Sequence, residues 1–217
     1  MANKLLVTGG NGFIGGEVCK VAVARGYEVV GVARSGAPDL DEPWVGEVTW
    51  VSADIFEPNL WRAHLAGCDA VIHSIGILKE QPDKGVTFER INGDAAIVAA
   101  EEAARAGVGA FVFVSASTTP PTVDNAYLEH KRRAETEIAK QDLRAVILRP
   151  SLVYGPKRPL SNVVGKAVEF AQKVPGVPQE DSPMSVETLA NAAMSAAEQG
   201  EVNRILDIDA IEALGKG

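Results

Sequence analysis

A glycine-rich run near the amino end carries the first chemistry that the sequence predicts, the binding of a diphosphate. The run follows a predicted strand and opens a predicted helix, and it consists of Gly9, Gly10, Asn11, Gly12, Phe13, Ile14 and Gly15. In such a run one glycine permits a tight turn, one lets the backbone approach a pyrophosphate, and one lets helix and strand pack closely. The amino end of the helix then presents unpaired N–H donors to the phosphates. The run predicts a dinucleotide site, and the alternative is a merely structural turn.

The end of the second predicted strand indicates which dinucleotide binds. An NAD-preferring site usually has Asp or Glu at this place, bonded to the ribose 2′-hydroxyl. Here the strand ends in Arg34 and Ser35, which can hold a 2′-phosphate. The sequence therefore favours NADP(H) over NAD(H). Alternatively, Arg34 stacks on adenine or is simply solvated.

Two more predicted strands end in residues that can contact the same ligand. Asp54 and Ile55 follow the third strand, where the Asp54 carboxylate can accept a hydrogen bond from the adenine amino group or instead cap a turn. The fourth strand ends in His73, Ser74, Ile75 and Gly76. Open α/β sheets bind ligands at this carboxyl edge. His73 is a candidate proton donor there, and the alternative is a histidine held in a structural hydrogen bond.

A tyrosine and a lysine four positions apart provide a candidate proton-transfer pair. Tyr127 and Lys131 lie within a predicted helix, so their spacing places them on one face and one turn apart. A neighbouring ammonium group lowers the pKa of a phenol, which makes Tyr127 a candidate proton donor or acceptor for a carbonyl or an alcohol. Lys131 can also hold the nicotinamide ribose. Ser115 and Ser117 finish the fifth predicted strand, and either hydroxyl can hydrogen-bond a substrate oxygen.

Composition and charge exclude several other classes of protein. The chain has 217 residues, of which 46% are hydrophobic and 23% charged, as in an ordinary globular protein. Its net charge of −8 is opposite to that of a phosphate-backbone binder, so nucleic acid is not an expected partner. Cys19 and Cys68 stand far apart in apolar contexts and predict neither a metal site nor a disulfide.

The elements that must position these residues follow from an alternation of short β-rich runs with longer helical stretches. That alternation predicts a doubly wound parallel sheet, a Rossmann-type α/β fold, with helices on both faces. The expected strands are Leu5–Thr8, Glu28–Ala33, Val48–Val51, Ala70–Ser74, Ala110–Ser115 and Ala145–Leu148. The clearest helices are Glu89–Arg105, which is rich in Ala and Glu and ends near Gly107 and Gly109, and Asn125–Lys140, which carries Glu and Lys pairs at helical spacing.

The regularity breaks after Arg149 and Pro150. Beyond them the sequence predicts helices at Ser161–Gln172 and Ser185–Glu198 and a strand at Arg204–Ile208. This last third is too small for a second domain. We therefore expect a single domain over residues 1–217, in which residues 151–217 form a small carboxyl-terminal lobe on the substrate side. No apolar run approaches the roughly 18 residues of a membrane-spanning helix.

Taken together, the motifs resemble a short-chain dehydrogenase/reductase of the extended or atypical kind. The resemblance spans essentially the whole chain and rests on the glycine-rich run, Asp54 and Ile55, Asn92, Ser115, Tyr127 with Lys131, and the segment 149–155. It implies that Asn92 supports a proton relay, and that Ser115 or Ser117 acts with Tyr127 and Lys131 in catalysis. It also implies that the backbone after Pro150, including Val153, meets the nicotinamide.

A closer likeness is carried by residues 10–15, 33–36, 53–58 and 73–78. These segments resemble the atypical members associated with ubiquinone biosynthesis, which are kin to the nucleotide-binding accessory subunit of respiratory complex I. In that group NADP(H) binding is common. In the sugar-nucleotide epimerases of the wider family the catalytic serine falls one residue after Ser115, where this chain has Ala116. Epimerase activity is therefore not expected.

Two functions remain open on this basis. One is an NADPH-dependent oxidoreductase that acts on a small carbonyl or quinone-like substrate. The other is a dinucleotide-bound assembly or regulatory subunit that performs no turnover, with a protein complex as its partner. The expected location is the cytoplasm, or an organelle matrix if a transit peptide has been removed.

Overall fold

The computed structural model describes residues 3–120, 123–156, 183–199 and 204–216. In these parts of the chain seven strands form one sheet, in the order β3-β2-β1-β4-β5-β6-β9. The strands are β1 (Lys4–Thr8), β2 (Glu28–Ala33), β3 (Val48–Ser52), β4 (Ala70–His73), β5 (Ala110–Val114), β6 (Ala145–Leu148) and β9 (Arg204–Leu206). Every neighbouring pair is parallel. This order confirms the doubly wound Rossmann-like α/β fold.

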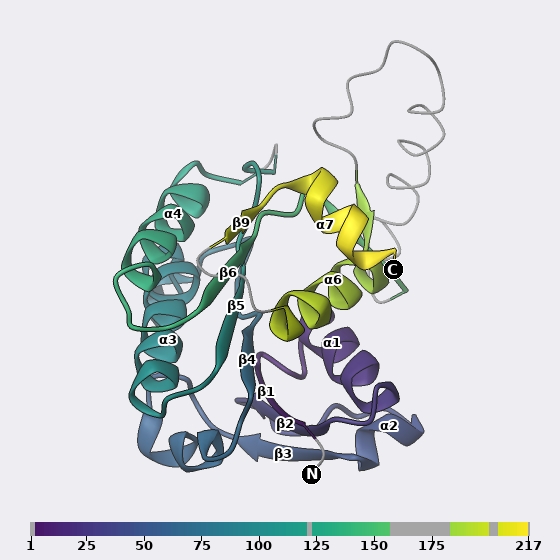
Figure 1. Cartoon of the computed structure of the whole chain (residues 1–217). Coiled ribbons are helices and arrows are strands. Elements are labelled where there is room, and N and C mark those ends of the chain that lie inside the picture. Colours follow the sequence, from purple (N-terminus) through teal and green to yellow (C-terminus); the bar gives the residue numbers. More distant parts are fainter. Residues whose placement is uncertain (1–2, 121–122, 157–182, 200–203, 217) are drawn as a thin grey trace.

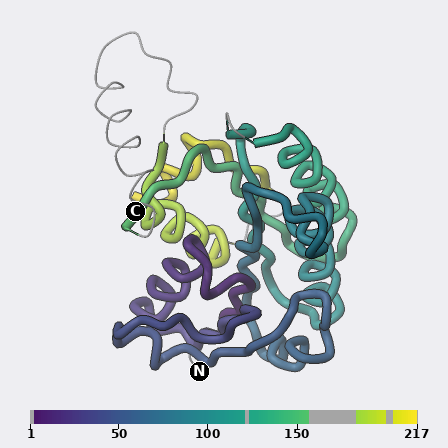
Figure 2. Tube along the Cα trace, turned by 180° about the vertical axis from the view of Figure 1, so that it is seen from behind, coloured from purple at the N-terminus to yellow at the C-terminus, as the bar shows by residue number. Residues whose placement is uncertain are grey.

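Helices cover both faces of the sheet, as Figures 1 and 2 show from opposite sides. The α-helices are α1 (Phe13–Ala24), α2 (Pro43–Gly46), α3 (Ala95–Arg105), α4 (Ala126–Ile138), α6 (Val186–Glu198) and α7 (Ile208–Gly215). Shorter elements are the 3₁₀ turns Pro58–Leu60, Arg62–Leu65 and Pro82–Lys84, the π-helical turn Glu89–Asp94, and the strand pair β7 (Val153–Tyr154) and β8 (Met184–Ser185). In Figure 1, α3 and α4 lie on one face, and α1, α2, α6 and α7 on the other.

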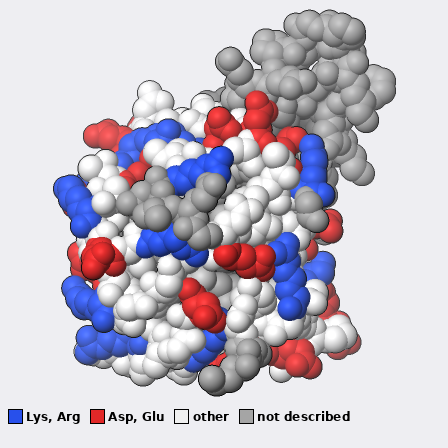
Figure 3. All heavy atoms as spheres, viewed as in Figure 1, with Lys and Arg blue, Asp and Glu red and all other residues white. Residues whose placement is uncertain are grey.

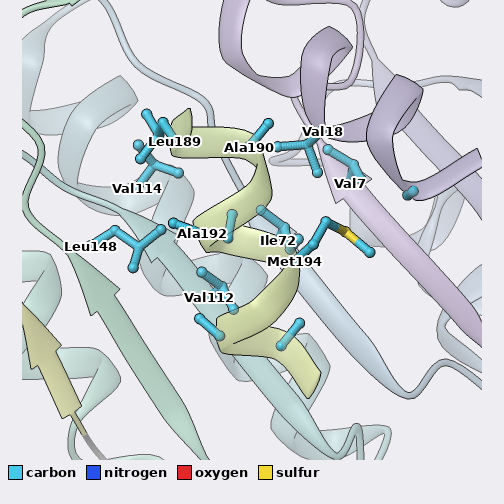
Figure 4. Packing of buried hydrophobic residues seen from close by; sticks show 14 of the residues in the cluster. Val7, Val18, Ile72, Val112, Val114, Leu148, Leu189, Ala190, Ala192 and Met194 are labelled. Carbon is cyan, nitrogen blue, oxygen red and sulfur yellow. The ribbon is translucent and has the colours of Figure 1, made fainter. Parts of the chain in front are cut away.

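The core is divided by the sheet into two apolar layers, because successive side chains of a strand point to opposite faces. In β5, Phe111 and Phe113 pack with α3 and α4, whereas Val112 and Val114 face α6. Figure 4 shows that Leu189, Ala192 and Met194 of α6 pack against apolar side chains of the central strands, among them Ile72, Val112 and Leu148. Strands buried on both faces read as continuous apolar runs, which is why they were recognisable in the sequence.

Several boundaries differ from the expectations. The expected helix Glu89–Arg105 begins as a π-helical turn and becomes α-helical only at Ala95. The expected strand Arg204–Ile208 ends at Leu206, because the Asp207 side chain caps α7 by accepting a hydrogen bond from the backbone N–H of Ala210. That helix was not predicted. The expected helix Ser161–Gln172 lies outside the described residues.

The described part of residues 151–217 contributes to the main sheet and its helical layer. β9 adds the last strand next to β6, and α6 packs against α1 and the central strands. A substrate-side lobe in this region stays a prediction. No helix within the described ranges is long and apolar enough to cross a membrane. On the face shown in Figure 3, acidic and basic side chains are interspersed and do not form one basic patch.

Candidate functional site

A cleft of about 1150 Å³ runs along the carboxyl ends of the strands. It crosses the point between β1 and β4 where the strand order reverses, which is the usual ligand site of an open α/β sheet. The predicted site residues that line it are Gly9, Asn11, Gly12, Phe13, Ile14, Arg34, Ser35, Asp54, Ile55, Ser74, Ile75, Gly76, Ser115, Tyr127, Lys131, Pro150 and Val153. The fold thus brings together predicted residues from seven segments of the chain. The predicted residues that do not line the cleft are Gly10, Gly15, His73, Asn92 and Ser117.

The glycine-rich turn connects β1 to α1 and forms one wall of the cleft. Gly9 has φ +77°, a left-handed conformation that favours glycine, and its N–H donates to the Val32 carbonyl at 2.8 Å. A Cβ atom on Gly15 would lie 2.2 Å from the Gly9 carbonyl oxygen, so the helix approaches the turn more closely than a side chain allows. These contacts fit the turn of a dinucleotide site, in which the N-terminus of α1 faces the phosphates.

The ends of β2 and β3 form the far end of the cleft. Arg34 is exposed, and Ser35 Oγ accepts a hydrogen bond from Asn11 Nδ2 at 2.8 Å, which links this end to the glycine-rich turn. Asp54 Oδ1 accepts a hydrogen bond from the backbone N–H of Phe56 at 3.0 Å, so one carboxylate oxygen caps the turn. The Arg90 guanidinium lies over the Phe56 ring, 3.8 Å from its centroid.

Tyr127 and Lys131 lie one turn apart on α4, as their spacing predicted, and both are buried. Lys131 Nζ donates to the Val114 carbonyl at 2.9 Å and lies 5.7 Å from the centroid of the Tyr127 ring. Burial lowers the pKa of Lys131 to about 8, although the Glu135 carboxylate opposes that shift. A proton-transfer role for the pair stays a prediction.

The Ser115 hydroxyl is hydrogen-bonded to a carboxylate on α4. It donates to Glu135 Oε1 at 2.5 Å, and the same carboxylate binds Arg132 and Arg149. Burial alone raises the pKa of Glu135, but the hydrogen bonds from Arg149 and Ser115 and the two guanidinium charges outweigh it and hold the pKa below its usual range. A hydroxyl has one proton to donate, so Ser115 cannot donate to Glu135 and to a substrate oxygen at the same time.

Ala116 lies two residues after the end of β5. It belongs to the same small apolar cluster as Phe88 and Tyr127. Ser117 does not line the cleft, and its buried hydroxyl has no partner in the described part of the chain. Thr118, two residues after Ala116, does line the cleft.

Asn92 and His73 lie behind the wall of the cleft. The Asn92 amide accepts a hydrogen bond from Ile77 N at 2.7 Å and donates to Ile77 O at 3.1 Å, so it holds the segment after β4. His73 is fully buried, and its Nδ1 shares a hydrogen bond with Thr8 Oγ1 at 2.8 Å. Burial, with a smaller contribution from the Lys131 charge, lowers the pKa of His73 to about 3. The imidazole is therefore neutral at physiological pH, which favours the structural interpretation of His73.

The charge lining the cleft is opposite to that of the whole chain. Among the described lining residues, the basic ones are Arg34, Lys79, Lys84, Arg90 and Lys131, and the acidic one is Asp54. This excess of cations fits a ligand that carries phosphates. Sequence reasoning missed Lys79 and Lys84, because they lie between the predicted strand and helix and alternate there with acidic residues. It also missed Arg90, which lies within the predicted helix.

Comparison with protein families finds a match over residues 5–175 to the NAD dependent epimerase/dehydratase family. An uncharacterized chloroplastic protein of Arabidopsis thaliana is 33% identical over 97% of this chain and 77% of its own length. The MIOREX complex component 2 of Saccharomyces cerevisiae is 31% identical over 76% of each chain. A ceramide reductase of Caulobacter vibrioides is 31% identical over 69% of this chain and 46% of its own length.

Solved structures share the fold at lower sequence identity. The Bordetella bronchiseptica enzyme WbmH, solved in complex with NAD⁺, aligns over all of this chain and 80% of its own. The TM-score is 0.70 and the sequence identity 20%. At this identity the likeness concerns the fold alone.

Proposed function

The chain belongs to the NAD dependent epimerase/dehydratase family, and from that premise we propose that it is an NADPH-dependent oxidoreductase acting on a small carbonyl or quinone-like substrate. The observation that carries the proposal is the buried Tyr127–Lys131 pair at the wall of a cleft that begins at the glycine-rich turn. The ceramide reductase among the relatives supports a reductase.

Within this proposal Tyr127 supplies the proton that the substrate oxygen gains. The bound nicotinamide supplies the hydride. Lys131, charged below its pKa of about 8, favours the phenolate that remains after the transfer. Asn92 is a positioning residue, because it holds the backbone of Ile77, which packs with Tyr127. For Ser115 and Ser117 a role in catalysis stays a prediction.

The proposed cofactor is NADP(H). Arg34 follows β2 without an acidic residue beside it, and Arg90, which stacks on Phe56, lines the same cleft. Two guanidinium groups suit a 2′-phosphate better than a 2′-hydroxyl.

A second candidate function is that of a dinucleotide-bound subunit without turnover. Ala116 in place of a serine and the engaged Ser115 hydroxyl favour it, and so does the similarity to a MIOREX complex component. The proposed kinship with ubiquinone-associated members and with the complex I accessory subunit belongs to this reading. The chloroplastic relative supports an organelle matrix as the location.

The test is the variant Tyr127→Phe, which removes the phenol and keeps the ring. NADPH oxidation is followed with 2-octanone and with menadione. We expect the variant to lose about 100-fold or more in kcat, while its NADPH affinity stays within about twofold of wild type. Tyr27→Phe is the matched control, because the Tyr27 hydroxyl lies outside the cleft and binds Glu198. Turnover by Tyr127→Phe at the wild-type rate contradicts the mechanism, and no turnover of either probe favours the second function.

A further inference from the structure

A short hairpin contributes to the lining of the cleft, as Tyr127 does. Gln81 and Val86 exchange backbone hydrogen bonds of 2.7 and 3.1 Å, and the 3₁₀ turn Pro82–Lys84 and Gly85, with φ +67°, close the loop between them. We refer to residues 78–87 as the 78–87 hairpin. It connects the segment after β4 with the π-helical turn.

Both ends of the 78–87 hairpin are anchored at Tyr127. Before it, Ile77 is held by the Asn92 amide and packs in the cluster of Tyr127. After it, the Phe88 ring meets the Tyr127 ring edge-on, with centroids 5.9 Å apart. The Glu80 carboxylate accepts a hydrogen bond from Phe88 N at 2.6 Å and closes the base of the hairpin. The two residues that flank the hairpin, Ile77 and Phe88, therefore both pack with Tyr127, the proposed proton donor.

The charges of the 78–87 hairpin are divided between its two sides. Lys79 and Lys84 line the cleft, whereas Glu80 and Asp83 do not. Both lysines are exposed, and neither ammonium group forms an ion pair in the described part of the chain. Lys79 and Lys84 therefore make this part of the cleft positively charged, since the acidic lining residue, Asp54, follows β3. A positive charge of this kind suits an anionic group on a ligand.

Aliphatic side chains accompany these cations. Leu78 is 42% exposed and Leu152 is 39% exposed, and both line the cleft. They come from different segments, one after β4 and one after β6. Large apolar side chains exposed inside a binding cleft indicate a ligand with an apolar part.

The phosphates of the dinucleotide do not need Lys79 and Lys84. The proposed phosphate site is the turn Gly9–Gly15 with the N-terminus of α1. Arg34 follows β2, and Arg90 stacks on Phe56, which follows β3. We propose, building on the proposed function, that the substrate is an amphiphilic carbonyl compound: an aliphatic chain packs on Leu78 and Leu152, and its carboxylate or phosphate group binds Lys79 and Lys84. The hairpin selects this substrate class.

The experiment measures binding, so that it does not depend on turnover. Protein saturated with NADPH is titrated calorimetrically with octanoate, 1-octanol and acetate. Octanoate should bind at least tenfold more tightly than either of the others, because it alone combines the chain and the anion. In the double variant Lys79→Ala/Lys84→Ala the affinity for octanoate should fall to that for 1-octanol, while NADPH affinity stays within twofold. Leu152→Ser should weaken octanoate and 1-octanol and leave acetate unchanged.

Lys140→Ala is the control for the loss of one exposed lysine outside the cleft, just beyond the end of α4, where Lys140 pairs with Glu137. It should leave every affinity unchanged. Octanoate binding no tighter than that of 1-octanol overturns the inference. The inference is also overturned if the double variant loses as much affinity for NADPH as for octanoate. That result would assign the two lysines to the cofactor phosphates. Octanoate contains no ketone, so its binding does not test the proposed reaction. If octanoate bound selectively but no ketone were reduced, the substrate site would be correct and the proposed reductase activity would be wrong.

Discussion

Glu135 shows how a single side chain holds the region behind the site together. Its carboxylate is nearly buried and receives donors from Ser115, Arg132 and Arg149, which come from three different segments. Its removal would leave two partly buried guanidinium groups without a counter-charge. Glu135 is therefore more important for stability than an exposed ion pair on the same helix, such as that of Glu137 with Lys140.

We expect Glu135→Gln to lower the free energy of unfolding by about 3 kcal/mol at pH 7, measured by urea denaturation. Because the folded state lowers the pKa of Glu135, its contribution is present above the unfolded pKa of about 4.3. It is lost as the pH falls through the lowered folded pKa, so the gap between wild type and variant should narrow in acid. Glu137→Gln should change stability by less than about 0.5 kcal/mol. If the difference in unfolding free energy between wild type and Glu135→Gln did not depend on pH, the stabilising role of the Glu135 carboxylate would be contradicted.

Among single residues, the sequence predicted those pairs whose spacing within one helix or strand determines that they lie side by side. Tyr127 and Lys131 were found because positions four apart on a helix share a face. The orientation of the Ser115 hydroxyl was not predictable, since it depends on Glu135 and Arg149, which only the packed fold brings together. Arg90 was missed for the same reason, because its partner Phe56 lies on another segment.

Among the elements, the junction of β1 with α1 has the least tolerance for change. A Cβ atom on Gly15 would lie 2.6 Å from Ser74 Oγ and still closer to the Gly9 carbonyl. The Ser74 hydroxyl in turn donates to the Thr8 carbonyl at 2.9 Å, so the turn and the end of β4 move together. A methyl group at this point displaces both.

Gly15→Ala should therefore destabilise the protein by about 1 to 3 kcal/mol and weaken dinucleotide binding by about tenfold or more, measured by thermal unfolding and by titration. Gly46→Ala on α2 is the matched control. No atom lies within 4 Å of a Cβ at that position, so we expect a change below about 0.5 kcal/mol. If Gly15→Ala bound NADPH as tightly as the control, close packing at the turn would not matter for the site.

The strands were predictable because those buried on both faces are short apolar runs bounded by glycine or polar residues. The helix α7 was not, since its first residues continue the apolar run of β9 and only the cap at Asp207 separates the two. The π-helical turn around Asn92 was also unpredictable. It has the composition of an ordinary helix, and the hydrogen bond that Asn92 accepts from Ile77, on another segment, is not visible in the sequence.

At the scale of the whole molecule, the cleft joins two halves of the sheet. Its lining comes from the ends of β1, β2 and β3 on one side and of β4, β5 and β6 on the other. A ligand that spans the cleft contacts both halves only in the folded state. It must therefore shift the unfolding of the entire domain.

We expect NADPH at 100 times its dissociation constant to stabilise the protein by about 2.7 kcal/mol, visible as a rise in Tm. NADH at the same concentration should raise Tm less. Arg34→Ala should remove most of this difference, because a lost charge-assisted contact costs about 1.5 to 3 kcal/mol. Arg62→Ala serves as the control, because Arg62 is exposed, lies outside the cleft and contacts Asn59. This variant should keep the difference between the Tm shifts caused by NADPH and NADH. Equal shifts by both dinucleotides in the wild type would assign Arg34 to another role.

The position of α6 in the chain affects how the protein is made. The helix covers Ile72, Val112 and Leu148 on one face of the sheet, yet it is synthesised after all three of their strands. While the chain is still on the ribosome, β4, β5 and β6 can pair with that face bare. Intermediates with exposed apolar surface are prone to aggregate. We therefore expect a nascent chain that ends before α6 to depend on a chaperone until that helix has been synthesised.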